Sequence, residues 1–404
     1  MSVLRSVSLI ILAGPLCAAL LRLSALTGSG QKTIDASRRV TQAPAADFET
    51  LKAKADEARE ADQIAEAVRL YEQLVKIRPG WAEGWWYVGT LHYDSDQYAP
   101  AAAAFSRYVT LERGNGQGWA MLGLCEFRMA QFASSREHLV KARSLGLGGN
   151  EELARVVRYH QAVLLTRARQ FEMAQALLNG FAVEHRESAA VLDALGLAVL
   201  RIPASLESLS AEKREMVRQF GKAAFLAGER RVPEARALYD AAEARYRDQP
   251  NVAYAYGVWL MMQKEPEHAM SFFRKELQRE PAHVPAMLQI AFHAIDSGNF
   301  EEAKAHALKA AELEPENFTA HYALGRIYLE SNAIPQAVTE LEKSARLAPD
   351  AASVQFVLAK AYARANRPAD AARARAEFRR LDAIDKKRRG EATGEESASG
   401  RPVP

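Results

Sequence analysis

Small and apolar residues recur along this chain with a period of 34 residues. A small residue is followed twelve positions later by Ala or Ser, and the last five of these pairs keep the spacing without a slip. The pairs are Ala55 with Ala67, Gly89 with Ala101, Gly123 with Ser135, Ala162 with Ala174, Ala223 with Ala235, Gly257 with Ala269, Ala291 with Ala303, Gly325 with Ala337, and Ala359 with Ala371. A fixed period of this length indicates stacked supersecondary units that share one continuous core.

Each period predicts two helices that cross closely at the small residues. Any side chain larger than Ala at the crossing would overpack the site, at about 1–3 kcal/mol. Large side chains four positions after the second-helix Ala or Ser would fill the space beside the crossing: Tyr71, Phe105, Leu139, Leu178, Tyr239, Phe273 and Leu341. Prolines that stop the second helix follow at one phase: Pro79, Pro281, Pro315 and Pro349. The pattern therefore predicts an all-α fold.

This pattern resembles the tetratricopeptide-repeat family. The family pattern W-x2-L-G-x2-Y, A-x3-F and P is visible in "WWYVGTLHY…APAAAAF" from Trp85 to Phe105 and in "HYALGRIYLESNAIPQAVTELEKSARLAP" from His321 to Pro349. The resemblance extends from Phe48 to Asp385. It implies a right-handed superhelical solenoid of paired antiparallel helices, with about nine to ten units in two blocks.

Two departures from the period suggest where the blocks end. "GLGGNEE" from Gly146 to Glu152 adds five residues, and "RIPASLESLSAEKREM" from Arg201 to Met216 lacks a second helix. We predict an N-terminal block over 48–202, an irregular insertion over 203–210 and a C-terminal block over 211–385. The polar segment 28–47 is predicted to be a linker, and the tail 386–404 to be disordered.

The N-terminal segment predicts export. Val7 to Leu21 has no charge over fifteen residues and follows the basic Arg5. That length suits a signal-peptide core better than a membrane-spanning helix of about 20 residues. We expect residues 1–27 to be either a cleaved signal peptide or a retained anchor that associates with the membrane. The protein is then expected to be periplasmic or membrane-anchored, and extracytoplasmic in either case.

Charge and motifs argue against catalysis and against nucleic-acid binding. The formal net charge is only +3, so no nucleic-acid partner is expected. H-E-x-x-H, P-loop and G-x-S-x-G motifs are missing, and neither the nine His nor Cys17 and Cys125 have metal-ligand spacing. The sequence therefore predicts no enzyme, no metal and no cofactor, with Cys125 as a small buried side chain.

The remaining candidate for function is a row of apolar residues on the first helices. In the family, positions 2, 5, 9 and 12 of the first helix tend to line the concave groove, so the resemblance implies that peptide ligands lie there. The candidates for peptide binding at these positions are Trp86, Tyr93, Phe127, Tyr159, Tyr254, Val258, Met261, Phe292, Tyr322 and Arg326. The row could instead pack on neighbouring units, and the sequence leaves both interpretations open. The Lys and Asn set with which chaperone-type relatives clamp a terminal carboxylate is missing at the aligned positions.

These observations predict a non-catalytic scaffold that binds protein or peptide segments in a concave groove, within a cell-envelope complex. An alternative is an accessory subunit of envelope enzyme machinery that handles peptidoglycan or glycans. A further alternative is an enzyme whose site is built on loops.

Overall fold

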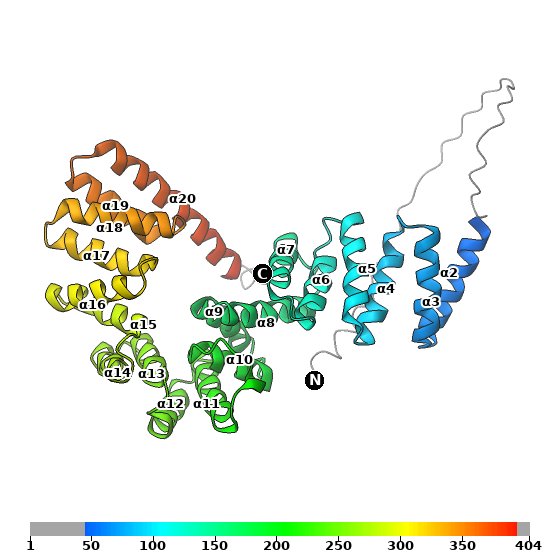
Figure 1. Ribbon diagram of the computed structural model, residues 1–404, viewed down its shortest axis with the longest axis horizontal. Coiled ribbons are helices and arrows are strands. Elements are labelled where there is room, and N and C mark those ends of the chain that lie inside the picture. Colours follow the sequence, from blue (N-terminus) through cyan, green and yellow to red (C-terminus); the bar gives the residue numbers. More distant parts are fainter. Residues whose placement is uncertain (1–44, 394–404) are drawn as a thin grey trace, which may run out of the picture. The chain divides into compact units, whose positions relative to one another are not determined.

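A computed structural model describes residues 45–393, with side chains described for residues 47–386, and this part of the chain is helical without any strand. The predicted signal or anchor segment, the linker up to residue 44 and the tail from residue 394 lie outside the described residues. Residues 386–393, which we expected to be disordered, continue the last helix. The predicted all-α solenoid of paired antiparallel helices is confirmed (Figure 1).

The chain divides into two compact units, described here one at a time. The first ends at Ser210 and also contains Gly228–Arg230, and the second comprises the residues from Ala211 onward apart from those three. The first unit has four helix pairs: α2 (Ala45–Glu60) with α3 (Ile64–Ile77), α4 (Ala82–Asp94) with α5 (Tyr98–Leu111), α6 (Gly116–Arg128) with α7 (Phe132–Leu145), and α8 (Glu151–Arg167) with α9 (Phe171–Val183). An unpaired α10 (Ala189–Val199) and the 3-10 turn η1 (Leu206–Ser208) follow.

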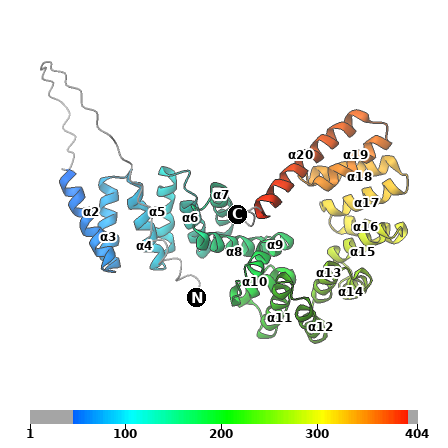
Figure 2. The same cartoon turned by 180° about the vertical axis from the view of Figure 1, so that it is seen from behind.

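The second unit has five helix pairs within the described residues. They are α11 (Ala211–Gly228) with α12 (Val232–Tyr246), α13 (Val252–Met262) with α14 (Pro266–Arg279), α15 (Val284–Asp296) with α16 (Phe300–Leu313), α17 (Phe318–Glu330) with α18 (Ile334–Leu347), and α19 (Ala352–Arg364) with α20 (Pro368–Thr393). Seen from behind, α15 to α19 succeed one another as neighbours in chain order (Figure 2).

The turn between the two helices of a pair has the same backbone conformation in every pair. A left-handed residue stands seven positions after the small first-helix residue, as at Asp96 with φ 58° and Gly298 with φ 76°. The amides of Asp96 and Gln97 then donate to the carbonyls of Tyr93 and His92 and satisfy the end of the helix. Asp, Asn and Gly tolerate this conformation best, which explains the turn sequences "DSDQ" and "DSGN".

The small residues stand where the paired helices touch, as predicted. A Cβ atom added to Gly89 would lie 2.8 Å from Cε1 of Phe105, and one added to Gly257 would lie 2.6 Å from Cε1 of Phe273. The predicted alanines and Ser135 are buried in every pair. The Ser135 hydroxyl also donates to the carbonyl of Gly123 at 2.7 Å, which joins α7 to α6.

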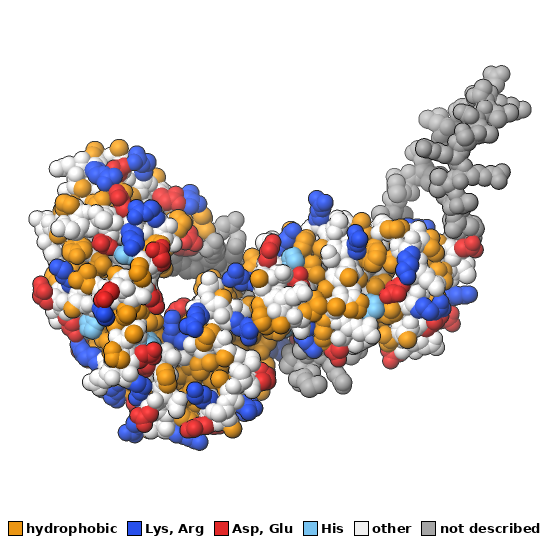
Figure 3. All heavy atoms as spheres, viewed as in Figure 1, with side chains coloured by type: hydrophobic (Ala, Val, Ile, Leu, Met, Phe, Trp, Pro, Cys, Tyr) orange, Lys and Arg blue, Asp and Glu red, His pale blue; other side chains and the backbone are white. Residues whose placement is uncertain are grey.

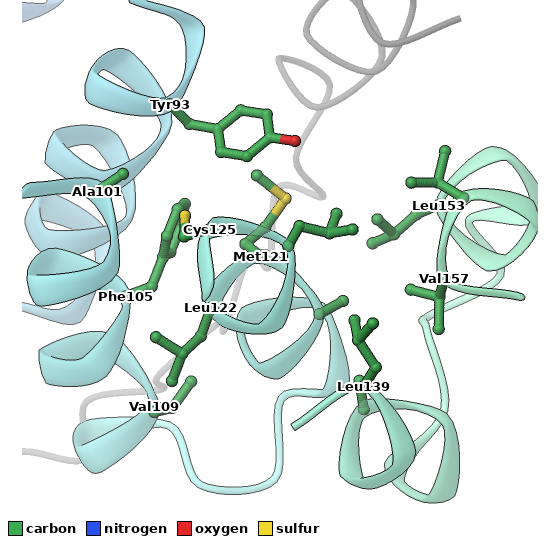
Figure 4. Packing of buried hydrophobic residues seen from close by; sticks show 14 of the residues in the cluster. Tyr93, Ala101, Phe105, Val109, Met121, Leu122, Cys125, Leu139, Leu153 and Val157 are labelled. Carbon is green, nitrogen blue, oxygen red and sulfur yellow. The ribbon is translucent and has the colours of Figure 1, made fainter. Parts of the chain in front are cut away.

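Within each unit, a second helix is covered by the first helix of the next pair where another pair follows. In the first unit, Phe105 and Val109 of α5 pack with Met121, Leu122 and Cys125 of α6 in one buried cluster (Figure 4). The cluster continues to Leu153 and Val157 of α8. Stacking therefore buries a continuous core, which no single pair could do alone.

Substituting Gly257 by Ala tests the close helix crossing. Because the new methyl group would overlap the Phe273 ring, Gly257→Ala should destabilise by about 1–3 kcal/mol, less up to about 1 kcal/mol gained in helix propensity. In a Phe273→Ala background the same change should stabilise, since the ring is gone. Urea unfolding followed by circular dichroism measures both effects.

Gly180→Ala in α9 is the matched control. A Cβ at this helical glycine would meet only the end of the Arg158 side chain, at 3.0 Å, and no ring or backbone atom. This variant should keep or raise the unfolding midpoint. Equal losses for Gly180→Ala and Gly257→Ala would contradict the steric explanation.

Candidate functional site

The ten candidate residues lie on first helices, three positions before, one after or four after the small residue, and we call them the first-helix stripe. In the first unit, α4 holds Trp86 and Tyr93, α6 holds Phe127 and α8 holds Tyr159. The second unit holds the other six, on α13 (Tyr254, Val258 and Met261), α15 (Phe292) and α17 (Tyr322 and Arg326). Eight of the ten side chains are half-buried, whereas Tyr93 and Tyr254 are each only 6% exposed.

In the first unit the stripe packs against other side chains of the array. The Trp86 ring lies 5.6 Å from the ring of Phe105 and 5.2 Å from that of Tyr108. Phe127 of α6 meets His160 of α8 edge-on, with ring centroids 4.7 Å apart. The rings of Trp86 and Phe127 therefore pack against neighbouring helices.

The other two stripe residues of the first unit, Tyr93 and Tyr159, also contact neighbouring rings. Tyr93 packs edge-on against Tyr98 at 5.5 Å, and Tyr159 packs against His160 at 5.2 Å. Burial raises the pKa of Tyr159 to about 12, so its hydroxyl stays protonated at any physiological pH.

In the second unit Tyr254 belongs to the core. Its ring lies 5.7 Å from Phe273 and 4.8 Å from His283, and its backbone amide donates to the buried carboxylate of Glu276 at 3.1 Å. Glu276 also accepts the amide of Asn251 at 2.8 Å. Tyr254 therefore offers no ring face to a ligand, and a polar substitution there would probe folding.

The other five second-unit residues form a half-open row on successive first helices. Val258 and Met261 on α13 are followed by Phe292 on α15, whose ring centroid is 6.0 Å from that of Tyr322 on α17. Arg326 is fixed by an ion pair with Asp296 at 2.9 Å. Burial raises the pKa of Tyr322, which keeps its hydroxyl as a hydrogen-bond donor beside an apolar surface.

The stripe continues into α19, where sequence reasoning did not follow it. Phe356 and Lys360 stand 34 positions after Tyr322 and Arg326, and the Phe356 side chain is 44% exposed. They border a cavity of about 680 Å³ between α17, α19 and α20. The 34-residue register was the signal that could have found them.

Side chains that could ligate a metal are scattered in the part of the chain that the structure describes. Within it, no three His, Cys, Asp or Glu side chains come together to hold a metal ion. Cys125 is buried, and burial raises the pKa of its thiol to about 12, so the nucleophilic thiolate is not formed at neutral pH. None of the described helices combines the length and the apolar character that a membrane span requires.

Family comparisons agree with the repeat pattern. Residues 52–118 match the family model "Tetratricopeptide repeat", and residues 206–382 match "Cilia and flagella-associated protein 70 middle TPR-like domain". Both matched segments, residues 52–118 and 206–382, are therefore of tetratricopeptide type. No curated protein matches the sequence.

Solved structures with similar arrays share little sequence with it. The crystal structure of the APC/C hetero-tetramer Cut9–Hcn1 is 11% identical, with a TM-score of 0.37 and coverage of 85% of this chain and 90% of that chain. The MamA RS-1 ArsTM double mutant is 16% identical, with a TM-score of 0.38 and coverage of 43% and 97%. Yeast Tom70 is 11% identical, with a TM-score of 0.31 and coverage of 88% and 97%. At this level of likeness, these structures say nothing about the partner of this tetratricopeptide-type array.

His160 is a buried titratable group at the centre of the first-unit stripe. Its Nδ1 lies 2.8 Å from the carbonyl of Val156 and donates to it, so Nδ1 carries the proton of the neutral ring. Burial, with a further contribution from Arg128, lowers the pKa of His160 to about 4. The array therefore folds around an uncharged imidazole packed between Phe127 and Tyr159.

Stability should fall as the pH drops from about 6.5 to about 4. In that window the unfolded chain protonates His160 while the folded chain does not, and one such group changes the free energy of unfolding by at most about 1.4 kcal/mol per pH unit. Above about pH 6.5 both states are neutral and the effect ends. His160→Gln should flatten the pH dependence of the urea midpoint between pH 6.5 and 4.5.

The exposed His268 gives the control, since its side chain is 74% exposed. His268 pairs with Glu265 at the surface, at 3.3 Å, so His268→Gln should change the pH dependence of the urea midpoint far less than His160→Gln does. An equally steep profile in His160→Gln would show that His160 does not carry the acid sensitivity.

Proposed function

We propose that the protein is a non-catalytic scaffold that binds a segment of a partner protein along the first-helix stripe of its second unit. The observation that carries this proposal is the half-open row of Val258, Met261, Phe292, Tyr322 and Arg326. Three successive first helices contribute to it.

The chemistry of the row suits a peptide rather than a small polar substrate. Aromatic and aliphatic side chains present a long apolar strip, and aromatic rings are frequent anchors at protein interfaces. Arg326 and the Tyr322 hydroxyl add two polar groups that can orient a peptide backbone. Because the array repeats, these groups recur at the spacing of the helix pairs, which favours an elongated ligand.

The first unit supports this assignment by contrast. Its stripe residues Trp86, Phe127 and Tyr159 are held by neighbouring aromatic rings at 4.7–5.6 Å. Opening that surface would cost packing energy before any ligand could bind. In the second unit Phe292 and Tyr322 also pack against buried apolar clusters, but their ring contact is with each other, at 6.0 Å.

Removing two rings of the row should abolish partner capture. Phe292→Ala with Tyr322→Ala shortens two half-buried aromatic side chains, so most helical content should survive while the apolar strip is lost. Affinity capture from a membrane-plus-periplasm fraction, read by mass spectrometry, measures the loss. A partner belonging to peptidoglycan or glycan enzymes would identify the scaffold as an accessory subunit.

Leu308→Ala with Leu313→Ala is the matched control on α16. These leucines are 45% and 38% exposed. Their substitution by Ala removes apolar surface from a second helix instead of a first helix. Capture should persist in this variant. Undiminished capture by the Phe292→Ala and Tyr322→Ala variant, with circular dichroism unchanged, would refute the proposed site.

We further propose that the scaffold works outside the cytoplasm, in a cell-envelope complex. The uncharged run from Val7 to Leu21 behind Arg5 supports this location. Signal-peptide cleavage and retention as an anchor remain the two alternatives.

Deleting residues 1–24 should leave the protein in the cytoplasm in soluble form. The removed segment holds the whole apolar run, so the export machinery would have nothing to recognise. Fractionation and immunoblotting of the full-length and shortened chains compare the two locations. Recovery of the shortened chain in the envelope fraction would overturn the export proposal.

A further inference from the structure

The last helix pair of the second unit, α19 and α20, has a face that the next first helix covers in the earlier pairs. Leu341 of α18 packs under Val357 and Leu358 of α19, just as Phe105 of α5 packs under α6. No helix follows α20 among the described residues, and Phe356 and Arg375 on the corresponding face of α19 and α20 are exposed.

On this face, two aromatic rings are arranged as they are at an interface between successive pairs inside the array. The rings of Phe356 on α19 and Phe378 on α20 are 5.2 Å apart, as are those of Trp86 and Tyr108 at the equivalent positions of α4 and α5. There the next first helix lies directly on the aromatic pair: a Cβ added to Gly118 of α6 would be 2.6 Å from the Tyr108 ring. The Phe356 and Phe378 pair thus marks a seat for one more helix.

The rim of this seat differs from the internal interfaces by its charge. The position four residues after the small second-helix residue, where Phe105 stands in α5, holds a buried apolar side chain in the eight earlier pairs. In α20 this position is occupied by the exposed Arg375. Arg375 borders the cavity of about 680 Å³ together with Lys360, Arg364 and Arg379, against the single carboxylate of Glu330. The Lys360 ammonium lies over the Phe356 ring, 4.2 Å from its centroid, at the edge of this surface. Figure 3 shows basic, acidic and hydrophobic side chains together over the end of this unit that holds α19 and α20.

The four basic residues at the cavity differ in whether they already have a hydrogen-bond or ion-pair partner. Arg364, also at the cavity, donates to the carbonyl of Leu329 at 2.6 Å and to Oδ1 of Asn332 at 2.9 Å. Arg375 and Arg379 have no ion-pair partner in the described part of the chain. A polar outer face is common on terminal repeats, but a Phe with 44% exposure beside a cavity goes beyond what solubility requires.

We propose that this terminal face binds an amphipathic helix of a partner protein that carries acidic residues beside its apolar side. The apolar side would cover Phe356 and Phe378 in the place that a following first helix takes in the internal pairs. The acidic residues would pair with Lys360, Arg375 and Arg379. This surface is separate from the Phe292 and Tyr322 row, and the inference goes beyond the proposed function.

Two labelled helical peptides of about 16 residues test the proposal on the full chain. Both have the same leucine positions, and their polar positions are all Glu in one peptide and all Lys in the other. Fluorescence anisotropy should show binding of the Glu peptide and not of the Lys peptide. Arg375→Glu with Arg379→Glu should raise the Kd of the Glu peptide at least about tenfold and create binding of the Lys peptide.

Arg373→Glu with Arg380→Glu is the matched control for charge on the same helix. These arginines are paired with Asp370 and Glu377, and they do not border the cavity. This variant and the Phe292→Ala with Tyr322→Ala variant should bind the Glu peptide within about twofold of the parent. Phe356→Ser should weaken binding about tenfold or more. An equal loss in the Arg373 and Arg380 control would show non-specific attraction and overturn the proposal.

Two other occupants would also overturn it. Binding of the Glu peptide that arises only after deletion of residues 394–404 would assign the face to the chain's own C-terminal segment. A self-associated protein in sedimentation that Arg375→Glu with Arg379→Glu dissociates would assign it to a second copy of the chain.

Discussion

The whole structure depends on the close approach of two helices in each pair. Gly257 faces the Phe273 ring with no room for a methyl group, and Gly89 faces Phe105 in the same way. This steric requirement fixes the rotation of the first helix about its axis. Once that rotation is set, residues three positions before and one position after the small residue must lie on a second face. The first-helix stripe is therefore a consequence of the packing constraint, whatever function it later acquires.

The fold could be predicted from sequence because that constraint is local and repeated nine times. How far the stripe is open could not, because it depends on what the second helix places beside it. Trp86 and Tyr322 share one register position. The second helix supplies the large Tyr108 next to Trp86 but only the small, buried Ser344 at the same position of the later pair. At Tyr254 the equivalent side chain is Glu276, which binds the backbone of α13 instead. Register alone carries none of these differences.

The terminal face was missed for a related reason. Phe356 and Lys360 follow from the same register as Tyr322 and Arg326, so their position could have been predicted. Their exposure could not, since it depends on whether another helix covers α19 and α20. Arg375 was the available signal, because it replaces an apolar side chain that is buried in every earlier pair. A charge at such a position indicates that the stacking stops there or that the next element is acidic.

The two candidate surfaces would bind by different means. At the first-helix stripe, Tyr322 and Phe292 already contact each other, so a ligand gains only the area that remains exposed. At the terminal face, burial of Phe356 and Phe378 would supply most of the affinity, at about 25 cal/mol per Å² of apolar surface. The exposed cations would add at most about 1 kcal/mol each. Their main effect would be on partner choice and association rate, because an acidic helix is attracted and a basic one is repelled before the apolar surfaces meet. Selectivity at that face is thus a property of Arg375 and Arg379, while binding strength is a property of the two phenylalanines beneath them.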